Sequence, residues 1–335
     1  MTQPPEFDDL DDDLDDDDEL GDEFDDDRAG FVSIDEFLAG SVDHTVPEGF
    51  RSGFVSLVGR PNVGKSTLLN RILGRKVSIV SDKPQTTRNQ IRGVLNRPGT
   101  QIVFVDTPGI HKPRTLMGER LNDAAIGAAS GVDVVCLLVD ATAPVGRGDA
   151  WVAERVPPDA VVIVNKVDLV SKDKVLDQLM RASDLDVVRE VASGTREYFP
   201  LSAATGEGVD ALVEHLITRL PNGPKWYPDD MVTDVEEAFW VAELVREKLL
   251  AVTHDELPHS IACRVTEWEW PRVRVEILVE RESQKGIVIG KKGAVLKQVG
   301  IAARREMLPG AFLELHVKVD KDWQRRPKAL DRLGY

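Results

Sequence analysis

An apolar stretch of the sequence runs directly into a loop bounded by glycines. Residues 54–58 read Phe-Val-Ser-Leu-Val, residues 59–66 read Gly-Arg-Pro-Asn-Val-Gly-Lys-Ser, and a helical pattern follows over residues 68–73. The spacing Gly-x-x-x-x-Gly-Lys-Ser between a strand and a helix is that of a phosphate-binding P-loop. We therefore predict an α/β domain that binds a nucleoside triphosphate.

Each residue type in this loop suits one part of the nucleotide. Successive backbone N–H groups cradle phosphate oxygens, the lysine reaches the β- and γ-phosphates, and the serine hydroxyl can ligate Mg²⁺. Here the lysine is Lys65 and the serine is Ser66. The predicted nucleotide-binding residues of the loop are Gly59, Asn62, Val63, Gly64, Lys65, Ser66 and Thr67.

A second apolar stretch, residues 101–105, ends in the acidic motif Asp106-Thr-Pro-Gly109. In nucleotide hydrolases the carboxylate of such a motif holds the metal, usually through water, and the glycine N–H senses the γ-phosphate. The motif therefore predicts Asp106 and Gly109 beside the γ-phosphate.

The polar segment 83–88, Lys-Pro-Gln-Thr-Thr-Arg, has the composition of a switch loop. A threonine of such a loop contacts Mg²⁺ and the γ-phosphate, which orders the loop only in the triphosphate state. We predict Thr87 for this role, with Thr86 as the alternative. The predicted catalytic residues are Lys65, Thr87, Asp106 and Gly109. The predicted metal ligands are Ser66, Thr87 and Asp106.

Two later segments predict which base is bound. Asn165-Lys166-Val-Asp168 follows the apolar residues 161–164. The Asp168 carboxylate can accept from guanine N1–H and the N2 amine, whereas adenine would leave a mismatched pair. A later loop of small residues can contact guanine O6 through its backbone. The predicted base-binding residues are Asn165, Lys166, Asp168, Ser202, Ala203 and Ala204. We therefore predict GTP as the substrate and GDP as the product.

Two positions in these motifs bear on turnover. Ile110 stands where Ras-like enzymes carry the glutamine that orients the attacking water, so we predict slow unassisted hydrolysis that depends on electrostatics. Asn62 has two open interpretations. It resembles the residue with which a set of bacterial GTPases hold K⁺ near the phosphates, or it shapes the loop through a side-chain hydrogen bond.

Strand candidates alternate with helical stretches over residues 53–220. This alternation predicts a mostly parallel sheet covered by helices on both faces, with the nucleotide loops at the carboxyl ends of the strands. The predicted strands are 54–58, 91–95, 102–105, 134–139, 161–164 and 198–201. Three prolines and a glycine then fall within residues 220–228, a composition typical of a linker.

The pattern beyond the linker is different. It predicts a helix over residues 233–253, strands over 260–266, 272–279 and 312–319, and two short helices within 286–307. The order αββααβ, with Gly290-Lys-Lys-Gly293 between the paired helices, is that of a bacterial-type (type II) KH domain, an RNA-binding α+β fold.

The charge of the C-terminal part also suits RNA. Residues 285–335 hold twelve Lys or Arg against five Asp or Glu, and such an excess attracts phosphates. The glycines of the loop permit close approach of the backbone to nucleotides. The predicted RNA-binding residues are Ile289, Gly290, Lys291, Lys292 and Gly293.

The acidity of the chain belongs to its N-terminal tail. The formal net charge is −16, and residues 1–27 contain sixteen Asp or Glu and no Lys or Arg. Self-repulsion and scarce apolar surface predict disorder for residues 1–48. Residues 31–38 could form a short helix on a partner. Three interpretations of the tail stay open: solubility, no role, or a nucleic-acid mimic that competes for a basic face.

No targeting signal is evident in this sequence. The first thirty residues lack the positive start and apolar centre of a signal peptide, and no apolar run approaches the ~18 residues of a membrane span. Cys136 and Cys263 lie in strand candidates and have no metal or disulfide spacing. We therefore predict a soluble, internal protein with two small core cysteines.

Residues 51–335 resemble the Era family of bacterial GTPases. The resemblance rests on Gly-Arg-Pro-Asn-Val-Gly-Lys-Ser-Thr, Pro-Gln-Thr-Thr-Arg, Asp-Thr-Pro-Gly-Ile and Asn-Lys-Val-Asp. It continues through Glu280-Arg-Glu-Ser-Gln-Lys285, the KH loop and the terminal Leu333-Gly-Tyr335. A single P-loop domain followed by a KH domain separates this family from tandem-domain GTPases. The predicted organisation is an acidic tail over 1–48, a GTPase domain over 51–221, a linker over 222–232, a type II KH domain over 233–323 and a C-terminal tail over 324–335.

The resemblance implies a slow, Mg²⁺-dependent GTPase in small ribosomal subunit assembly. Its KH domain would bind the 3′ end of small-subunit rRNA, with GTP favouring the RNA-binding arrangement. The resemblance also implies a monomer that contacts the assembling 30S subunit, in the cytoplasm and partly peripheral at the inner face of the cell membrane. The acidic tail departs from the family pattern.

Two alternative functions stay open on the sequence alone. One is a regulatory GTPase whose C-terminal domain binds a protein partner rather than rRNA. The other is a constitutive RNA-binding module whose nucleotide is structural.

Overall fold

The computed structural model describes residues 47–113, 115–187, 197–254 and 257–335. All of them belong to one compact unit of the chain, Val32–Tyr335. The segment predicted to be disordered lies outside the described residues except for residues 47 and 48, and so does the helix candidate over residues 31–38.

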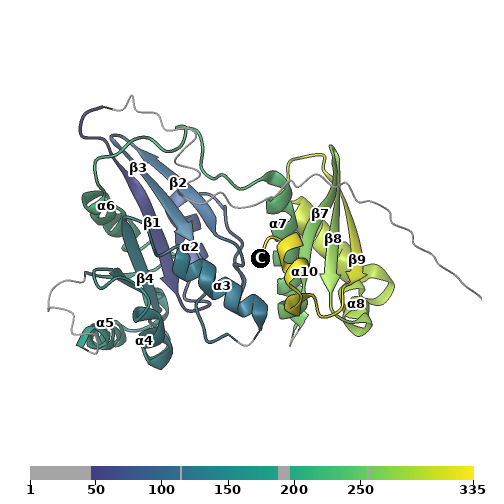
Figure 1. The fold of residues 1–335 in the computed structure, drawn as a ribbon, viewed down its shortest axis with the longest axis horizontal. Helices are drawn as coiled ribbons and strands as arrows, with labels where there is room; N and C mark the ends of the chain where they lie inside the picture. The colour runs from purple at the N-terminus through teal and green to yellow at the C-terminus, as the bar shows by residue number, and fades with distance from the viewer. Residues whose placement is uncertain (1–46, 114, 188–196, 255–256) are drawn as a thin grey trace, which may run out of the picture. The chain divides into compact units, whose positions relative to one another are not determined.

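The N-terminal domain alternates strands and helices along the chain (Figure 1). Its strands are β1 (Arg51–Gly59), β2 (Ile91–Arg97), β3 (Thr100–Asp106), β4 (Val134–Asp140), β5 (Val161–Asn165) and β6 (Tyr198–Leu201). Its helices are α2 (Lys65–Leu73), α3 (Leu116–Gly127), α4 (Arg147–Ala153), the short η1 (Val167–Leu169), α5 (Lys172–Val187) and α6 (Val209–Arg219). Every strand predicted from the sequence is present.

These strands form one sheet in the order β2-β3-β1-β4-β5-β6. β2 runs antiparallel to β3, and every other neighbouring pair is parallel. The prediction of a mostly parallel sheet is confirmed. Because parallel strands point the same way, the carboxyl ends of β1, β3, β4 and β5 meet at one edge, where ligands bind in folds of this kind.

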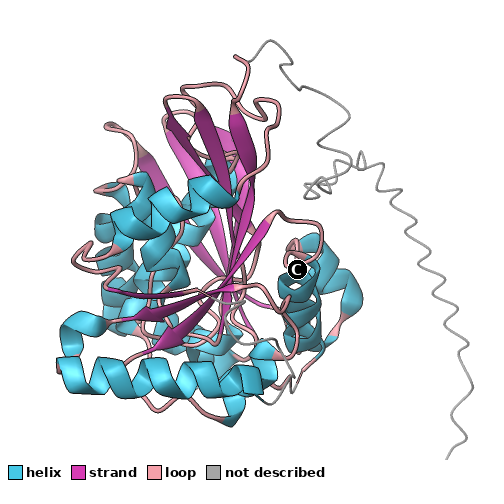
Figure 2. Cartoon of the chain, turned by 90° about the vertical axis from the view of Figure 1, so that its left-hand side faces the viewer, coloured by secondary structure: helices cyan, strands magenta, loops and turns pink. Residues whose placement is uncertain are grey.

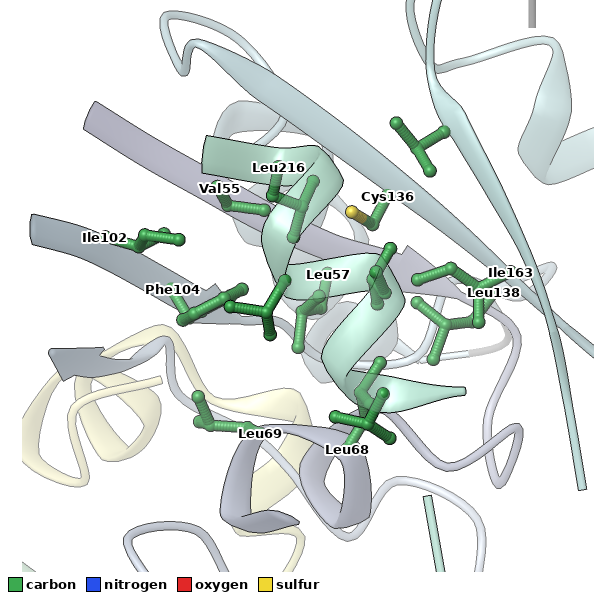
Figure 3. Close-up of a cluster of buried hydrophobic side chains, with 14 of the residues drawn as sticks. Val55, Leu57, Leu68, Leu69, Ile102, Phe104, Cys136, Leu138, Ile163 and Leu216 are labelled. Atoms are coloured by element: carbon green, nitrogen blue, oxygen red, sulfur yellow. The ribbon is translucent and has the colours of Figure 1, made fainter. Parts of the chain in front are cut away.

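Helices cover both faces of this sheet (Figure 2). Val55 and Leu57 of β1 belong to a buried cluster with α2 and α6, whereas Phe54 and Val58 pack in clusters on the opposite face. Successive side chains of a strand point to opposite faces, so a strand covered on both sides is apolar throughout. Figure 3 shows the first cluster, which includes Cys136. Each buried leucine in it contributes roughly 1.5–3 kcal/mol relative to an exposed one.

The C-terminal domain follows the predicted order αββααβ. Its elements are α7 (Glu237–Val252), η2 (Leu257–Ser260), β7 (Ala262–Glu269), β8 (Arg272–Val279), α8 (Glu282–Ile289), η3 (Lys291–Gly293), α9 (Ala294–Arg304), β9 (Phe312–Val319), η4 (Trp323–Arg325) and α10 (Pro327–Arg332). The three strands pair in the order β7-β8-β9, antiparallel and then parallel. Alternate residues of β8 bury against α7, α8 and α9, and Cys263 lies in the same core.

Three boundaries differ from the sequence prediction. The helix expected from residue 233 begins at Glu237, because Thr233 forms a β-bridge with Gly93 and donates its hydroxyl to the Arg92 carbonyl. The strand expected over 260–266 runs from Ala262 to Glu269, after a short 3₁₀ turn. The first of the paired helices begins at Glu282, where the Gln284 side chain accepts from the backbone N–H groups before the helix.

Residues 222–232, predicted as a linker, lie along β2 and β3. The Gln101 side chain accepts from the N–H groups of Trp226 and Tyr227 and donates to the Tyr227 carbonyl. Residue 94 donates its N–H to the Val232 carbonyl at 2.8 Å. These bonds fix the segment on the N-terminal domain.

The C-terminal residues pack against both domains. Trp323 and Leu330 are fully buried in a cluster with Met117 and Leu121 of α3 and with Leu278 of β8. Among the described residues, no helix is long and apolar enough to cross a membrane.

Candidate functional site

The P-loop joins β1 to α2 at the carboxyl edge of the sheet. Gly64 has φ +100°, and a Cβ atom there would lie 2.2 Å from Nδ2 of Asn165, so only glycine fits. Lys65 is buried, and its Nζ donates to the carbonyls of Gly59 at 3.4 Å and Arg60 at 3.2 Å. Burial lowers the pKa of Lys65 to about 8, against the raising effect of the Asp106 charge. An anionic ligand would stabilise this buried ammonium.

Three hydroxyl groups surround the carboxylate at the end of β3. Ser66 and Ser78 donate to Asp106 Oδ2 at 2.6 and 2.9 Å, and Thr87 Oγ1 lies 2.9 Å from Ser66 Oγ. Burial raises the pKa of Asp106, and the Lys65 charge and these hydroxyls oppose that effect. The structure thus brings the three predicted metal ligands together and adds Ser78, which the motif did not indicate.

This corner fits Mg²⁺ by its donor set. Asp106 Oδ1 is buried, and nothing in the described part of the chain forms a hydrogen bond with it. A buried carboxylate oxygen without a partner is costly unless a cation or its water fills the place. Among the described residues, no group of three or more His, Cys, Asp or Glu side chains is arranged to hold a metal ion. One carboxylate with two hydroxyls suits Mg²⁺, which takes few protein ligands and completes its shell with phosphates and water.

The two threonines of the switch loop differ in their partners. Thr86 Oγ1 donates to the Lys83 carbonyl at 2.7 Å, within the loop. The Thr87 hydroxyl instead faces Ser66. The geometry therefore favours Thr87 over Thr86 as the metal ligand.

The P-loop, both switch threonines and the glycine of the Asp106 motif line one cavity of about 460 Å³. The predicted residues that line it are Asn62, Gly64, Lys65, Ser66, Thr67, Thr86, Thr87, Gly109 and Lys166. The predicted residues outside this lining are Gly59, Val63, Asp106, Asn165, Asp168, Ser202, Ala203 and Ala204. Gln85 also lines the cavity, and its Nε2 lies 2.8 Å from Nε2 of His111, which follows the Asp106 motif. Ile110 is buried in the core beside Val58 and lies outside this lining.

The base-recognition residues tie the P-loop to the neighbouring loops. Asn165 donates Nδ2 to the Val63 carbonyl at 2.8 Å and accepts at Oδ1 from the Ala203 N–H at 2.9 Å. Lys166 Nζ donates to the Asn62 carbonyl at 2.7 Å. Asp168 lies on η1 with an exposed side chain, and Ser202 is buried.

Two residues of this region were missed by the sequence analysis. Asp140, at the end of β4, accepts from Lys166 Nζ at 2.6 Å. Burial opposes its charge, but hydrogen bonds from Lys166 and Thr142 hold its pKa below the usual range. Its signal was the same as that of Asp106, an acidic residue at the end of an apolar strand. Arg71 of α2 donates to the carbonyls of Ala203 and Ala204, and no sequence pattern indicates that contact.

Asn62 has a left-handed backbone, with φ +63°. Its Nδ2 donates to the Asp82 carbonyl at 2.5 Å. This hydrogen bond supports the loop-shaping interpretation, and it leaves the side-chain oxygen for a cation, so both interpretations remain open.

A second candidate site lies between α8 and α9. Gly290 has φ +73° and Gly293 has φ +78°, and Lys291 and Lys292 between them are exposed. A Cβ atom at Gly290 would lie 2.5 Å from Val295 Cγ2, whereas one at Gly293 would meet nothing within 4 Å. Ile289 at the end of α8 is half-buried. The loop thus offers bare backbone and positive charge to a ligand.

Comparison with known proteins places both sites in one family. A family model described as a 50S ribosome-binding GTPase matches residues 54–166, and a KH domain model matches residues 256–324. A protein of Mycobacterium leprae, GTPase Era, is 50% identical over 304 residues, which cover 85% of this chain and 99% of that protein. The chain belongs to the Era family of GTPases. GTPase Era of Geotalea uraniireducens is 45% identical over 298 residues, 85% of this chain and 98% of its own.

Solved Era structures share the fold of this Era-family chain. A single-residue variant of Aquifex aeolicus Era bound to GDP·AlF₄⁻ matches with a TM-score of 0.79 and 37% identity, over 85% of this chain and 99% of its own. An Era structure in complex with MgGDPNP and nucleotides 1506–1542 of 16S ribosomal RNA matches with the same score, identity and coverage. Because each superposition covers nearly all of the solved chain, it includes both the GTPase and the KH domain.

Proposed function

We propose that this Era-family GTPase binds the 3′ end of 16S rRNA through its KH loop and acts in assembly of the small ribosomal subunit. One observation carries the proposal: the Era structure described with MgGDPNP and 16S nucleotides matches this chain over 99% of its own length. The family model that names the 50S ribosome covers the GTPase domain alone, residues 54–166, so the 16S complex is the better guide to the RNA. The exposed Lys291 and Lys292 between two glycines suit phosphate contacts.

The roles proposed in the nucleotide site follow from the donor set. Ser66, Thr87 and Asp106 would hold Mg²⁺, which supplies charge neutralisation between the β- and γ-phosphates. Lys65 would donate to the same phosphates, and the Gly109 N–H would meet the γ-phosphate. Asn165 and Lys166 hold the P-loop against the base loops. Asp168, Ser202, Ala203 and Ala204 would contact guanine.

Further proposals rest on the family resemblance. They are a monomer that contacts the assembling 30S subunit in the cytoplasm, with partial peripheral contact at the inner face of the cell membrane. We also propose, on the same resemblance, that Asn62 holds K⁺ near the phosphates.

The function is tested by titration of the full chain, loaded with a GTP analogue, into labelled RNA of the 3′-end sequence and a scrambled control. We expect preference for the 3′-end sequence at every salt concentration, together with weaker binding at higher salt. Equal affinity for both RNAs, or no binding, would favour the alternative in which the C-terminal domain binds a protein.

Guanine selectivity is predicted to depend on Asp168. Asp168→Asn replaces a carboxylate that accepts from the N2 amine with an amide that can donate to the 2-oxo group of xanthine. We expect the variant to shift its preference from GTP towards XTP, measured by competition against a fluorescent analogue. Undiminished preference for GTP over XTP would refute the assignment.

A further inference from the structure

The KH domain contacts the switch segment, residues 76–89, along most of its length. The Val80 N–H donates to Glu247 Oε1 at 3.0 Å, and Lys76 Nζ donates to Glu247 Oε2 at 2.6 Å. At the other end, Asn89 Nδ2 donates to the Gly334 carbonyl at 2.7 Å. The segment that carries Thr87 is therefore held between α7 and the C-terminal residues.

Arg88 anchors the segment in the KH domain. Its side chain is buried, its Nη1 donates to the Ile261 carbonyl at 2.6 Å, and its Nη2 donates to the His259 carbonyl at 3.1 Å. The guanidinium carbon lies 5.8 Å from the ring centre of Trp323 and 5.5 Å from that of Tyr335. Burial lowers the pKa of Arg88, and the neighbouring Tyr335 and Glu243 oppose that effect.

Arg246 of α7 also contacts the switch segment. Its side chain is fully buried, and its Nη2 donates to the Thr86 carbonyl. Its Nε donates to Glu243 Oε1 at 2.7 Å, so a carboxylate of the same helix balances the charge. Because both charges are buried, removal of one partner alone would leave the other buried and unpaired.

The Thr86 carbonyl bears directly on the metal ligand. This C=O and the Thr87 N–H belong to one planar peptide group, so a bond that fixes the carbonyl also fixes the backbone that enters Thr87. The Thr87 hydroxyl lies 2.9 Å from Ser66, which donates to Asp106 at 2.6 Å. A continuous path of contacts thus runs from Arg246 to the metal corner.

We propose that Arg246 is a positioning residue of the GTPase site: it holds the Thr86 carbonyl so that Thr87 faces the metal and the γ-phosphate. The KH domain then supplies part of the triphosphate-binding geometry. The inference rests on the proposed function. The Era structure described with a triphosphate analogue matches this chain over 99% of its own length, so the match includes both the switch segment and α7.

The test uses the full-length chain with the double change Glu243→Met and Arg246→Met, which removes the pair without leaving a buried charge unpaired. We expect affinity for the GTP analogue with Mg²⁺ to fall at least about fivefold, the lower end of couplings between sites. Affinity for GDP should stay near wild type, because Thr87 contacts the γ-phosphate and not GDP. The ratio of the two affinities is the readout, since a general loss of structure would lower both.

The matched control is Arg264→Met with Glu276→Met. Arg264 and Glu276 form a less buried arginine–glutamate ion pair on the sheet of the same domain, with Nε and Oε2 2.8 Å apart. This control should keep the wild-type ratio. If the first double variant does not fold, Arg246→Lys gives the same test, because a lysine keeps the charge beside Glu243 but lacks the planar fork.

An unchanged ratio in a folded Arg246 variant, or an equal loss for both nucleotides, would overturn the inference. The proposed function is tested separately, by RNA binding of the wild-type chain. A wild type that binds the 3′-end RNA together with a variant of unchanged ratio would contradict only the positioning role. A wild type that does not bind that RNA would contradict the proposed function whatever the ratio.

Discussion

Replacement of Lys65 by alanine is expected to abolish tight GTP binding, with an affinity loss of at least about a hundredfold. The change would remove the two charge-assisted hydrogen bonds to phosphate oxygens that are proposed for Lys65, each worth roughly 1.5–3 kcal/mol. Lys65 is buried against the Gly59 and Arg60 carbonyls, so no other cation can easily take its place. Titration of a fluorescent GTP analogue with Mg²⁺ measures the effect.

Ile110→Ala is the matched comparison for that variant. Its side chain lies in the core beside Val58 and carries no polar group that could orient water. We expect the rate of basal hydrolysis to stay within about tenfold of wild type, a barrier change of ~1.4 kcal/mol. The rate is measured by the release of phosphate. A comparable collapse at both positions would show that the isoleucine shares in the chemistry.

Gly293→Asp is expected to cause the largest loss of RNA affinity of any single change in the KH loop. It would place bulk and negative charge on the proposed phosphate path, at a position where a Cβ atom would meet nothing within 4 Å. Gly293 has φ +78°, and Asp and Asn tolerate such a backbone better than other residues. Gly290→Asp should also weaken RNA binding, but a Cβ there would lie 2.5 Å from Val295, so the fold itself would be disturbed.

Two further variants separate charge from shape. Gly293→Asn adds the same bulk without charge, so it should lose less affinity than Gly293→Asp. Lys292→Ala would remove one proposed phosphate contact and should mainly lower the salt slope by about one unit. Nucleotide binding and basal GTP hydrolysis should stay near wild type in all of them. Unchanged affinity of Gly293→Asp for the RNA 3′ end, at fixed salt with a GTP analogue bound, would favour the alternative in which the C-terminal domain binds a protein partner.

The sequence predicts the elements whose signals are local. A strand that is buried on both faces is apolar throughout, and the apolar runs 134–139 and 161–164 both form such strands. The spacing of the P-loop motif predicts its place between a strand and a helix, and the loop joins β1 to α2. The order of the KH elements is likewise visible, since strand and helix periodicities differ.

Other features depend on contacts between distant residues and could not be predicted. The helix expected from Thr233 begins later because that residue pairs with Gly93 in another domain. The sequence gives no sign that Arg246 differs from other arginines of an amphipathic helix. In the structure it is buried and donates a hydrogen bond to the switch segment. Only the tertiary fold brings such residues together, and no local pattern records it.

The family resemblance implies that GTP favours the RNA-binding arrangement, and this coupling of the two sites is tested by the affinity of one RNA in two nucleotide states. The full-length chain is titrated with 3′-end RNA at fixed salt, once with a GTP analogue and Mg²⁺ and once with GDP. We predict tighter RNA binding with the GTP analogue. By linkage, the RNA should raise the affinity for the analogue over GDP by the same factor. Equal RNA affinity in the two states would contradict the account, because the nucleotide would then be structural and the KH domain a constitutive RNA-binding module.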